Sequence, residues 1–192
     1  MASAVAELLA NLSAALDSLG VRWYLFGAQA AILYGAARLT ADVDVTVDPG
    51  AHSVAEFVEA LQREKFSPRL TDLENFVERT RVLPLVHEPS RMPCDVVLAG
   101  PGIEELFLSR VQVHVVEGVT IPVASADDVV VMKVLAGRAK DLDDVVSVIR
   151  AQGSSLNVNR ARETIRQLEQ ALDQRDLLPL LDQILDRARR SR

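Results

Sequence analysis

The sequence predicts an α/β (α+β) fold followed by a helical C-terminal lobe, and two observations lead to this class. Over residues 1–124, short apolar runs of strand character alternate with helical patterns. Residues 125–192 contain helical patterns alone. We therefore expect two domains, an α/β domain at 1–124 and a helical lobe at 125–192.

Hydrophobic periodicity and cap signals define the first elements. Leucines at helical spacing predict a helix that ends at Gly20. Ser53, with Glu56 three positions later, has the spacing of a capping box. In chain order, we expect a helix (3–19), a strand (21–26), a helix (28–35), a strand (43–48) and a helix (53–64).

The runs FVERTRVLPLVH (76–87) and CDVVLAG (94–100) flank the loop EPSRMP and predict a hairpin of two strands, with Asp95 on its second arm. Pro122 cannot donate to a sheet ladder, which confines the strand at 119–123 to an edge or its own end. The remaining elements expected are a helix (102–109), a strand (111–118), and helices at 126–136, 140–151, 157–172 and 176–190.

Composition excludes several classes of protein. The formal net charge is −6 and aromatic residues make up 4% of the chain, which argues against a broad basic nucleic-acid footprint and against a base-stacking platform. Most of the acidity lies in the first two thirds, and the tail RARRSR is basic. Cys94 is the single cysteine, in agreement with a reducing compartment. No signal peptide or membrane-spanning run is visible, so we expect a cytoplasmic protein without a membrane partner.

The stretch ADVDVTVDPG places Asp42, Asp44 and Asp48 at even spacing, hence on one face of a strand. Crowded carboxylates repel one another unless a cation or a solvated edge compensates. Asp42 and Asp44 are suitable ligands for Mg²⁺, and Asp95 could add a third carboxylate from a neighbouring strand. Three carboxylates could hold two metal ions about 3.5–4 Å apart, the separation used for in-line phosphoryl displacement.

Three other interpretations of this stretch are possible. An EF-hand loop counted from Asp42 fails, because Val47 and Ser53 stand where glycine and glutamate are needed. A haloacid-dehalogenase-type phosphatase also uses D-x-D-x-T, but there the motif follows its strand, whereas here the valines come after Asp42. The third interpretation is a solvated edge strand with incidental aspartates.

The surroundings of the pair favour a functional interpretation. The run YLFGAQAAILYGAARLTADVDVTVD resembles the nucleotidyltransferase superfamily with the DNA polymerase β fold, in which a G-[GS] turn and a helix precede an [DE]-h-[DE]-h strand. It is more closely similar to the branch that contains the AbiEii-type toxins of type IV toxin–antitoxin systems and their uncharacterised nucleotidyltransferase relatives. The block MKVLAGRAKDLDDV (132–145) resembles the second signature of that branch.

The resemblance implies a polymerase β-like fold, with a mixed sheet flanked by helices. It also implies that Asp42, Asp44 and Asp95 bind two Mg²⁺ ions and that Asp95 acts as base on the acceptor hydroxyl. Lys133 interrupts an apolar run, so its ammonium must either reach water or meet an anion, and the resemblance makes it catalytic. An ordinary strand-end aspartate is the alternative for Asp95.

Further residues are implied in nucleotide binding. Gly27 and Ala28 would present backbone N–H groups to phosphate, although Ala28 replaces the usual glycine or serine. Arg138 and Lys140 would contact the triphosphate, and Arg38 and Thr40 would touch phosphate or brace the loop.

Other polar residues have simpler expected roles. Asp141 is expected to orient Lys140 or Arg138, and Asp144 and Asp48 to be structural and solvated, respectively. We expect Cys94 to be a packing residue. The three histidines, His52, His87 and His114, fit no metal-ligand spacing.

The leading hypothesis is a Mg²⁺-dependent nucleotidyltransferase that moves NMP from an NTP to an acceptor hydroxyl and releases pyrophosphate. The acceptor could be tRNA, a protein or a small molecule, and a cognate antitoxin is a possible partner. The alternatives are a nucleotide- or partner-binding module with little turnover, and a haloacid-dehalogenase-type phosphatase, which would release inorganic phosphate.

Overall fold

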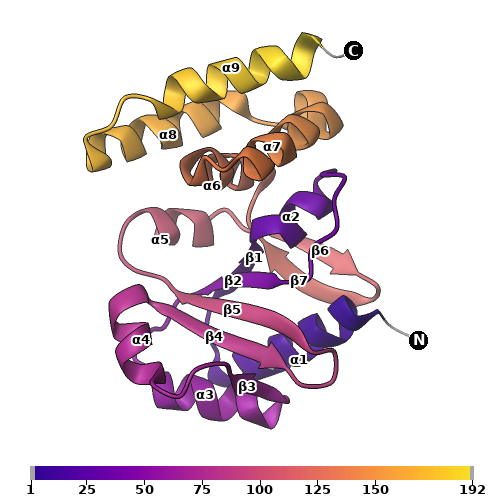
Figure 1. The fold of residues 1–192 in the computed structure, drawn as a ribbon, viewed down its shortest axis with the longest axis vertical. Coiled ribbons are helices and arrows are strands. Elements are labelled where there is room, and N and C mark those ends of the chain that lie inside the picture. Colours follow the sequence, from indigo (N-terminus) through magenta and orange to yellow (C-terminus); the bar gives the residue numbers. More distant parts are fainter. Residues whose placement is uncertain (1–2, 191–192) are drawn as a thin grey trace. The chain divides into compact units, whose positions relative to one another are not determined.

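The computed structural model describes residues 3–190 (Figure 1). The chain forms two compact units. The sheet unit comprises the residues up to Phe26 together with Ala41–Ala124, and the helical unit comprises Gly27–Thr40 and the residues from Ser125 onward. The chain changes unit between Ala124 and Ser125, and segment 27–40 joins the C-terminal helices. The two domains expected at 1–124 and 125–192 stay a prediction.

The sheet unit is built on one mixed sheet (Figure 1). Its strands are β1 (Trp23–Phe26), β2 (Val43–Val47), β3 (Phe66–Pro68), β4 (Val82–His87), β5 (Met92–Leu98), β6 (Gln112–Val116) and β7 (Val119–Val123). They lie in the order β3-β4-β5-β2-β1-β7-β6. The pairs β2·β5 and β1·β7 are parallel, and the others are antiparallel. The predicted α/β class with a mixed sheet is confirmed.

Four helices belong to the sheet unit: α1 (Ala4–Leu19), α3 (Val54–Arg63), α4 (Leu73–Thr80) and α5 (Ile103–Leu108). α1 ends at Gly20 in the left-handed conformation and packs against α3. Leu8, Leu12 and Leu16 of α1 are fully buried, and each contributes about 1.5–3 kcal/mol through burial. The predicted capping box at Ser53 is present, with the Glu56 side chain accepting from the Ser53 N–H.

Two elements differ from those the sequence predicts. Residues Phe76–Thr80, expected to start a strand, form the end of α4, and β3 was not expected. The run FVERT has no clear period of two, and α4 buries Val77 as a helix and ends where Arg81 adopts φ 58°. A strand as short as β3 gives too few residues for a pattern. Pro122 is the penultimate residue of β7, where it is the partner of Val113 in β6, and only Val123 is paired with β1. The proline therefore lies near the end of its strand.

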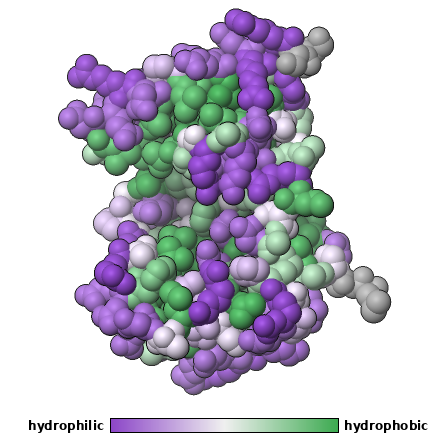
Figure 2. Space-filling model, viewed as in Figure 1, coloured by the Kyte–Doolittle hydropathy of each residue, from purple (hydrophilic) through white to green (hydrophobic). Residues whose placement is uncertain are grey.

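The helical unit contains α2 (Gly27–Leu33), α6 (Ala126–Ala136), α7 (Ala139–Gln152), the 3₁₀ helix η1 (Gly153–Ser155), α8 (Val158–Leu172) and α9 (Leu177–Arg190). These agree closely with the predicted helices. α9 buries one stripe, including Leu181 and Ile184, and Figure 2 shows hydrophilic residues along the outer side of this helix layer. Within residues 3–190, no helix is long and apolar enough to cross a membrane.

His87 is a fully buried side chain at the end of β4. Its Nε2 accepts from Asn11 Nδ2 of α1 at 3.0 Å, so the ring proton is on Nδ1, which donates to Ser90 Oγ at 2.7 Å. Its ring also lies 4.9 Å from that of Phe66. Burial lowers the pKa of His87, and the residue is therefore a neutral packing group that connects α1 with the β4–β5 hairpin.

Candidate active site

Asp44 and Asp95 are direct neighbours on one face of the sheet unit. They are partners in the parallel pair β2·β5, whose strands lie about 4.8 Å apart. The valines that alternate with Asp44, Val43 and Val45, are fully buried on the other face, while both aspartates are partly exposed. Alternation in two separate strands has therefore directed two carboxylates to the same side.

Asp42 directly precedes β2 and is exposed. Asp42 is two positions before Asp44, a spacing that would direct both side chains to the same face of an extended strand. The first aspartate of a haloacid-dehalogenase-type phosphatase follows its strand, whereas Asp42 precedes β2. Among residues 3–190, no group of three or more His, Cys, Asp or Glu side chains is gathered in a way that could hold a metal ion. The site of three carboxylates and two metal ions therefore stays a prediction.

Arg69 is a functional candidate that the sequence did not single out. Its guanidinium forms an ion pair with Asp95, and the two side chains are 37% and 38% exposed. Arg69 directly follows β3, a strand too short to predict, and its partner lies 26 positions later in the chain. No local pattern marks such a contact. The third carboxylate of the predicted site is thus already paired with a cation.

Cys94 and Asp48 lie in or directly after the two strands that carry these aspartates, and their environments differ. Cys94 is buried on the opposite face from Asp95, and burial raises the pKa of its thiol, which agrees with the predicted packing role. Asp48 is not simply solvated as expected, because Arg22 donates to it at 2.6 Å. This pairing, with the N–H of Gly50, holds the pKa of Asp48 below its ordinary value.

A buried charge cluster lies in the helical unit, between α6 and α7. Lys133 Nζ donates to Asp141 at 3.1 Å and to Asp144 at 2.7 Å, and all three residues are at most 5% exposed. Gly137, with φ 63°, is the C-cap of α6, and Arg138 is the N-cap of α7, so the chain turns back and brings the two helices together. Lys133 therefore meets protein carboxylates.

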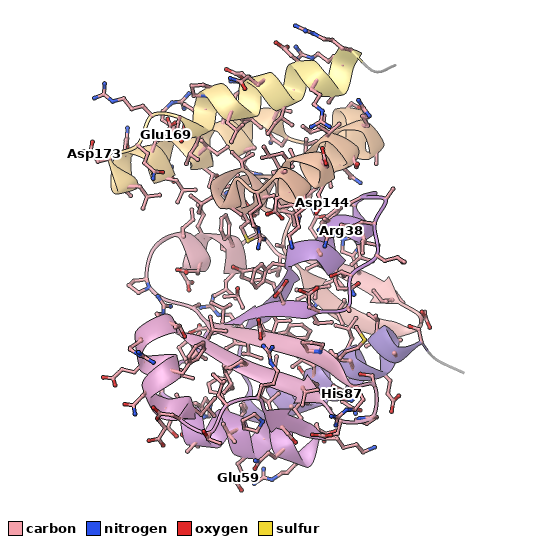
Figure 3. The ribbon with its side chains drawn as sticks, viewed as in Figure 1. Arg38, Glu59, His87, Asp144, Glu169 and Asp173 are labelled. Atoms are coloured by element: carbon pink, nitrogen blue, oxygen red, sulfur yellow. The ribbon has the colours of Figure 1, made fainter. Side chains whose placement is uncertain are left out.

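Two arginines extend this cluster. Arg38 Nη1 donates to Asp144 at 3.0 Å, a pair that Figure 3 labels, and Arg138 forms an ion pair with Asp141. Burial alone would raise the pKa of Asp141, but hydrogen bonds from Arg138 and Lys133 outweigh it and the pKa is lowered. The cluster thus joins three cationic side chains to two carboxylates. Arg38 and Arg138 are its more exposed members, at 25% and 64%.

The other residues expected to bind nucleotide lie at several places in the helical unit. Lys140 is exposed on α7, and Thr40 is half-buried at the end of segment 27–40. Gly27, with φ 67°, opens α2, and Ala28 follows with 8% exposure. α2 has seven residues, which limits the dipole at its N-terminus. Phosphate binding by these residues stays a prediction.

The sequence also gave no sign of a second buried carboxylate cluster in the helical unit. Asp127 accepts from the N–H of Asn157 at 2.8 Å and from Arg160 Nε at 2.6 Å, which ties α6 to the start of α8. Ser125 Oγ, at the N-cap of α6, donates to Asp128 at 2.7 Å. Burial and these two aspartates raise the pKa of Tyr34. We assign this cluster a structural role.

Residues 3–177 match the family described as "Nucleotidyltransferase of unknown function (DUF6036)". The chain belongs to this nucleotidyltransferase family. Among curated proteins, no sequence matches the chain.

Solved structures similar to this nucleotidyltransferase share its fold. The antibiotic-resistance factor ANT(2'')-Ia has a TM-score of 0.62 at 14% identity, over 90% of this chain and 97% of that one. An antigenic nucleotidyltransferase-like protein from Paracoccidioides brasiliensis has a TM-score of 0.55 at 17% identity, over 95% and 94% of the two chains. The lincosamide antibiotic adenylyltransferase LnuA, solved with lincomycin, has a TM-score of 0.51 at 13% identity, over 74% and 94%. At these identities the likeness establishes the polymerase β-like fold.

Proposed function

We propose that this nucleotidyltransferase moves NMP from an NTP to an acceptor hydroxyl with the help of Mg²⁺ held by Asp42, Asp44 and Asp95. The observation that carries the proposal is the register of β2 and β5, which sets Asp44 beside Asp95. Carboxylate oxygens are the ligands that Mg²⁺ prefers, and Asp44 and Asp95 would supply them from neighbouring strands. When bound, the metal would neutralise charge on the triphosphate.

The chain's own residues would do the rest of the chemistry. The acceptor oxygen forms a bond to the α-phosphorus of the NTP, and the bond from that phosphorus to pyrophosphate breaks. Asp95 takes the proton of the acceptor hydroxyl, for which its partly exposed carboxylate is available once Arg69 is displaced. Catalysis then rests on positioning and on charge neutralisation.

We propose phosphate-binding roles for Arg38 and Arg138, and for Gly27, Ala28, Thr40 and Lys140 as predicted. Lys133 was predicted to be catalytic. Because its ammonium is buried and bonded to Asp141 and Asp144, we propose that it positions the two arginines through these carboxylates. A positioning role of this kind is typical of residues just behind a binding surface.

For the acceptor, we favour a small hydroxylated molecule over tRNA or a protein. Two proteins of similar fold, ANT(2'')-Ia and LnuA, are an antibiotic-resistance factor and an antibiotic adenylyltransferase, which supports this choice. The net charge of −6 is also unfavourable for an RNA acceptor. A role in a toxin–antitoxin pair, with a cognate antitoxin, rests on the resemblance to AbiEii-type toxins alone.

Pyrophosphate release tests the proposal. The purified chain is incubated with Mg²⁺, each of the four NTPs, and an acceptor panel of aminoglycosides, lincosamides, bulk tRNA and the protein itself. We expect one combination to release pyrophosphate in a metal-dependent way, and Asp44→Asn to lower the rate roughly a hundredfold or more.

Asp48→Asn is the matched control, because Asp48 directly follows the same strand and pairs with Arg22 outside the proposed site. Equal pyrophosphate release by wild type and Asp44→Asn would refute the proposal. Release of inorganic phosphate in place of pyrophosphate would favour the phosphatase hypothesis. Metal-dependent NTP binding without release in any combination would favour the binding module, which the unusual Ala28 supports.

A further inference from the structure

The ion pair of Arg69 and Asp95 is held in place by the register of three strands. The N–H of Arg69 donates to the carbonyl of Pro84 at 2.9 Å, and Pro84 is the partner of Asp95 across β4 and β5. Paired residues on adjacent strands project from the same face of a sheet. The guanidinium of Arg69 therefore lies on the face of Asp95 and reaches it across one intervening strand.

The same face also holds Asp44, the partner of Asp95 in β2·β5. Like charges directly opposite one another on neighbouring strands are destabilising, so this pair requires a cation. Arg69 supplies that cation through its ion pair with Asp95, so two carboxylates and one guanidinium lie on one face of the sheet.

We propose that Arg69 is the resident counter-ion of this carboxylate site. Its guanidinium pairs with Asp95 in the metal-free protein and competes with a divalent cation for that carboxylate. The inference rests on the proposed function, in which Asp44 and Asp95 bind the metal. Arg69 thereby sets the affinity for the metal, and a metal ion that binds Asp95 must first displace the guanidinium.

The exposure of the pair makes the exchange feasible. With side chains 37% and 38% exposed, the ion pair is of the partly solvated kind that contributes little to stability, so its loss costs the protein little. The bond from the Arg69 N–H to Pro84 keeps the backbone in place while the long side chain changes rotamer. A buried pair such as Lys133–Asp144 would not be exchanged in this way, because its loss would leave a buried charge.

Binding of Mn²⁺ in the absence of nucleotide tests this role without depending on turnover. Free Mn²⁺ is measured by electron paramagnetic resonance for wild type, Arg69→Gln, Arg69→Lys and Asp44→Asn. Removal of a positive charge next to a bound cation should lower the Kd for Mn²⁺ in Arg69→Gln roughly tenfold, after allowance for solvent screening. Arg69→Lys keeps the charge and should bind Mn²⁺ with an affinity close to that of wild type.

The matched control is Arg91→Gln, which removes an exposed arginine paired with Glu88 at the turn of the same hairpin and should leave the Kd unchanged. If Asp44→Asn abolishes binding but Arg69→Gln binds Mn²⁺ no more tightly than wild type, the role of Arg69 is refuted while the metal site stands. If Asp44→Asn binds Mn²⁺ as wild type does, the metal site itself is refuted, and both proposals fail.

Discussion

Replacement of Lys133 by methionine would remove the central cation of the buried cluster in the helical unit. The ammonium donates to Asp141 and Asp144, which are 2% and 4% exposed. Methionine is similar in length and apolar, so the change leaves little cavity and acts mainly through charge. What remains is a pair of buried carboxylates that have lost their shared partner.

The cost follows from the burial of these carboxylates. Breaking a buried ion pair by removal of one partner typically costs about 3–5 kcal/mol. Arg38 and Arg138 still pair with the two aspartates and compensate in part, so we expect the low end of this range. For a chain of 192 residues, 1 kcal/mol corresponds to about 2–4 °C in Tm, which gives a decrease of roughly 6–12 °C.

Thermal unfolding followed by circular dichroism measures this decrease, with Lys140→Met as the matched control. Lys140 is the neighbouring lysine on α7, is exposed, and should change the free energy of unfolding by less than about 0.5 kcal/mol when replaced. A decrease for Lys133→Met no larger than that of the control would refute the reasoning. It would mean that the carboxylates are solvated and do not depend on the ammonium.

Three further predictions concern pH, packing and reactivity. Burial lowers the pKa of His87 from its ordinary value of 6.5, so the unfolded state binds the proton more readily than the folded state. The free energy of unfolding should therefore keep the full contribution of neutral His87 above pH 6.5 and decrease as the pH falls below it. His87→Gln should flatten this pH dependence, as measured by urea unfolding. Gly35→Ala places a Cβ 2.3 Å from the Cβ of Ala151, at a backbone φ of 106°. Gly118→Ala is the control, because its φ is 88° but the space around it is open. Denaturant unfolding should show a decrease in the free energy of unfolding that is roughly 1–3 kcal/mol larger for Gly35→Ala than for Gly118→Ala. Cys94 should resist iodoacetamide in the native protein and react in denaturant, as followed by mass spectrometry, because its thiol is buried with a raised pKa.

Local patterns predicted most of the fold, and the exceptions have a common physical cause. Period-two valines at β2 and the capping box at Ser53 are short-range signals, and both elements form where expected. Residues 76–80, FVERT, carry two apolar residues without a decisive period, so their sequence does not distinguish the end of α4 from a strand. β3 has three residues, so its identity depends on pairing with β4 and not on its own sequence.

The grouping of segment 27–40 with the C-terminal helices is likewise a long-range property. The segment precedes the DVDV strand in the chain, and its sequence contains no composition change that would separate it from the α/β region. Contacts of α2 with α6 and α7 decide its place, and these helices are about 100 residues away in the chain. Helical periodicity identifies a helix but not the partner that covers it.

The candidate site shows the same division between residue and partner. Asp44 could be placed by the alternation of its own strand, whereas Asp95 was expected beside it only because its strand could pair alongside. Lys133 could be recognised as a charge that needs an anion, but its sequence allowed phosphate as readily as the two aspartates that it meets. Arg69 could not be recognised at all, since its importance depends on the register of three strands.

Either a metal ion or an arginine can offset the charge of neighbouring carboxylates such as Asp44 and Asp95. Repulsion between Asp44 and Asp95 implies a compensating cation, and from the sequence alone Mg²⁺ was the natural choice. In the structure a guanidinium already supplies part of that charge. The crowding therefore does not by itself require a metal ion. Mg²⁺ binds at this site only if it competes successfully with Arg69. The free energy gained when the carboxylates bind the ion must therefore exceed the free energy lost when the arginine is displaced from Asp95.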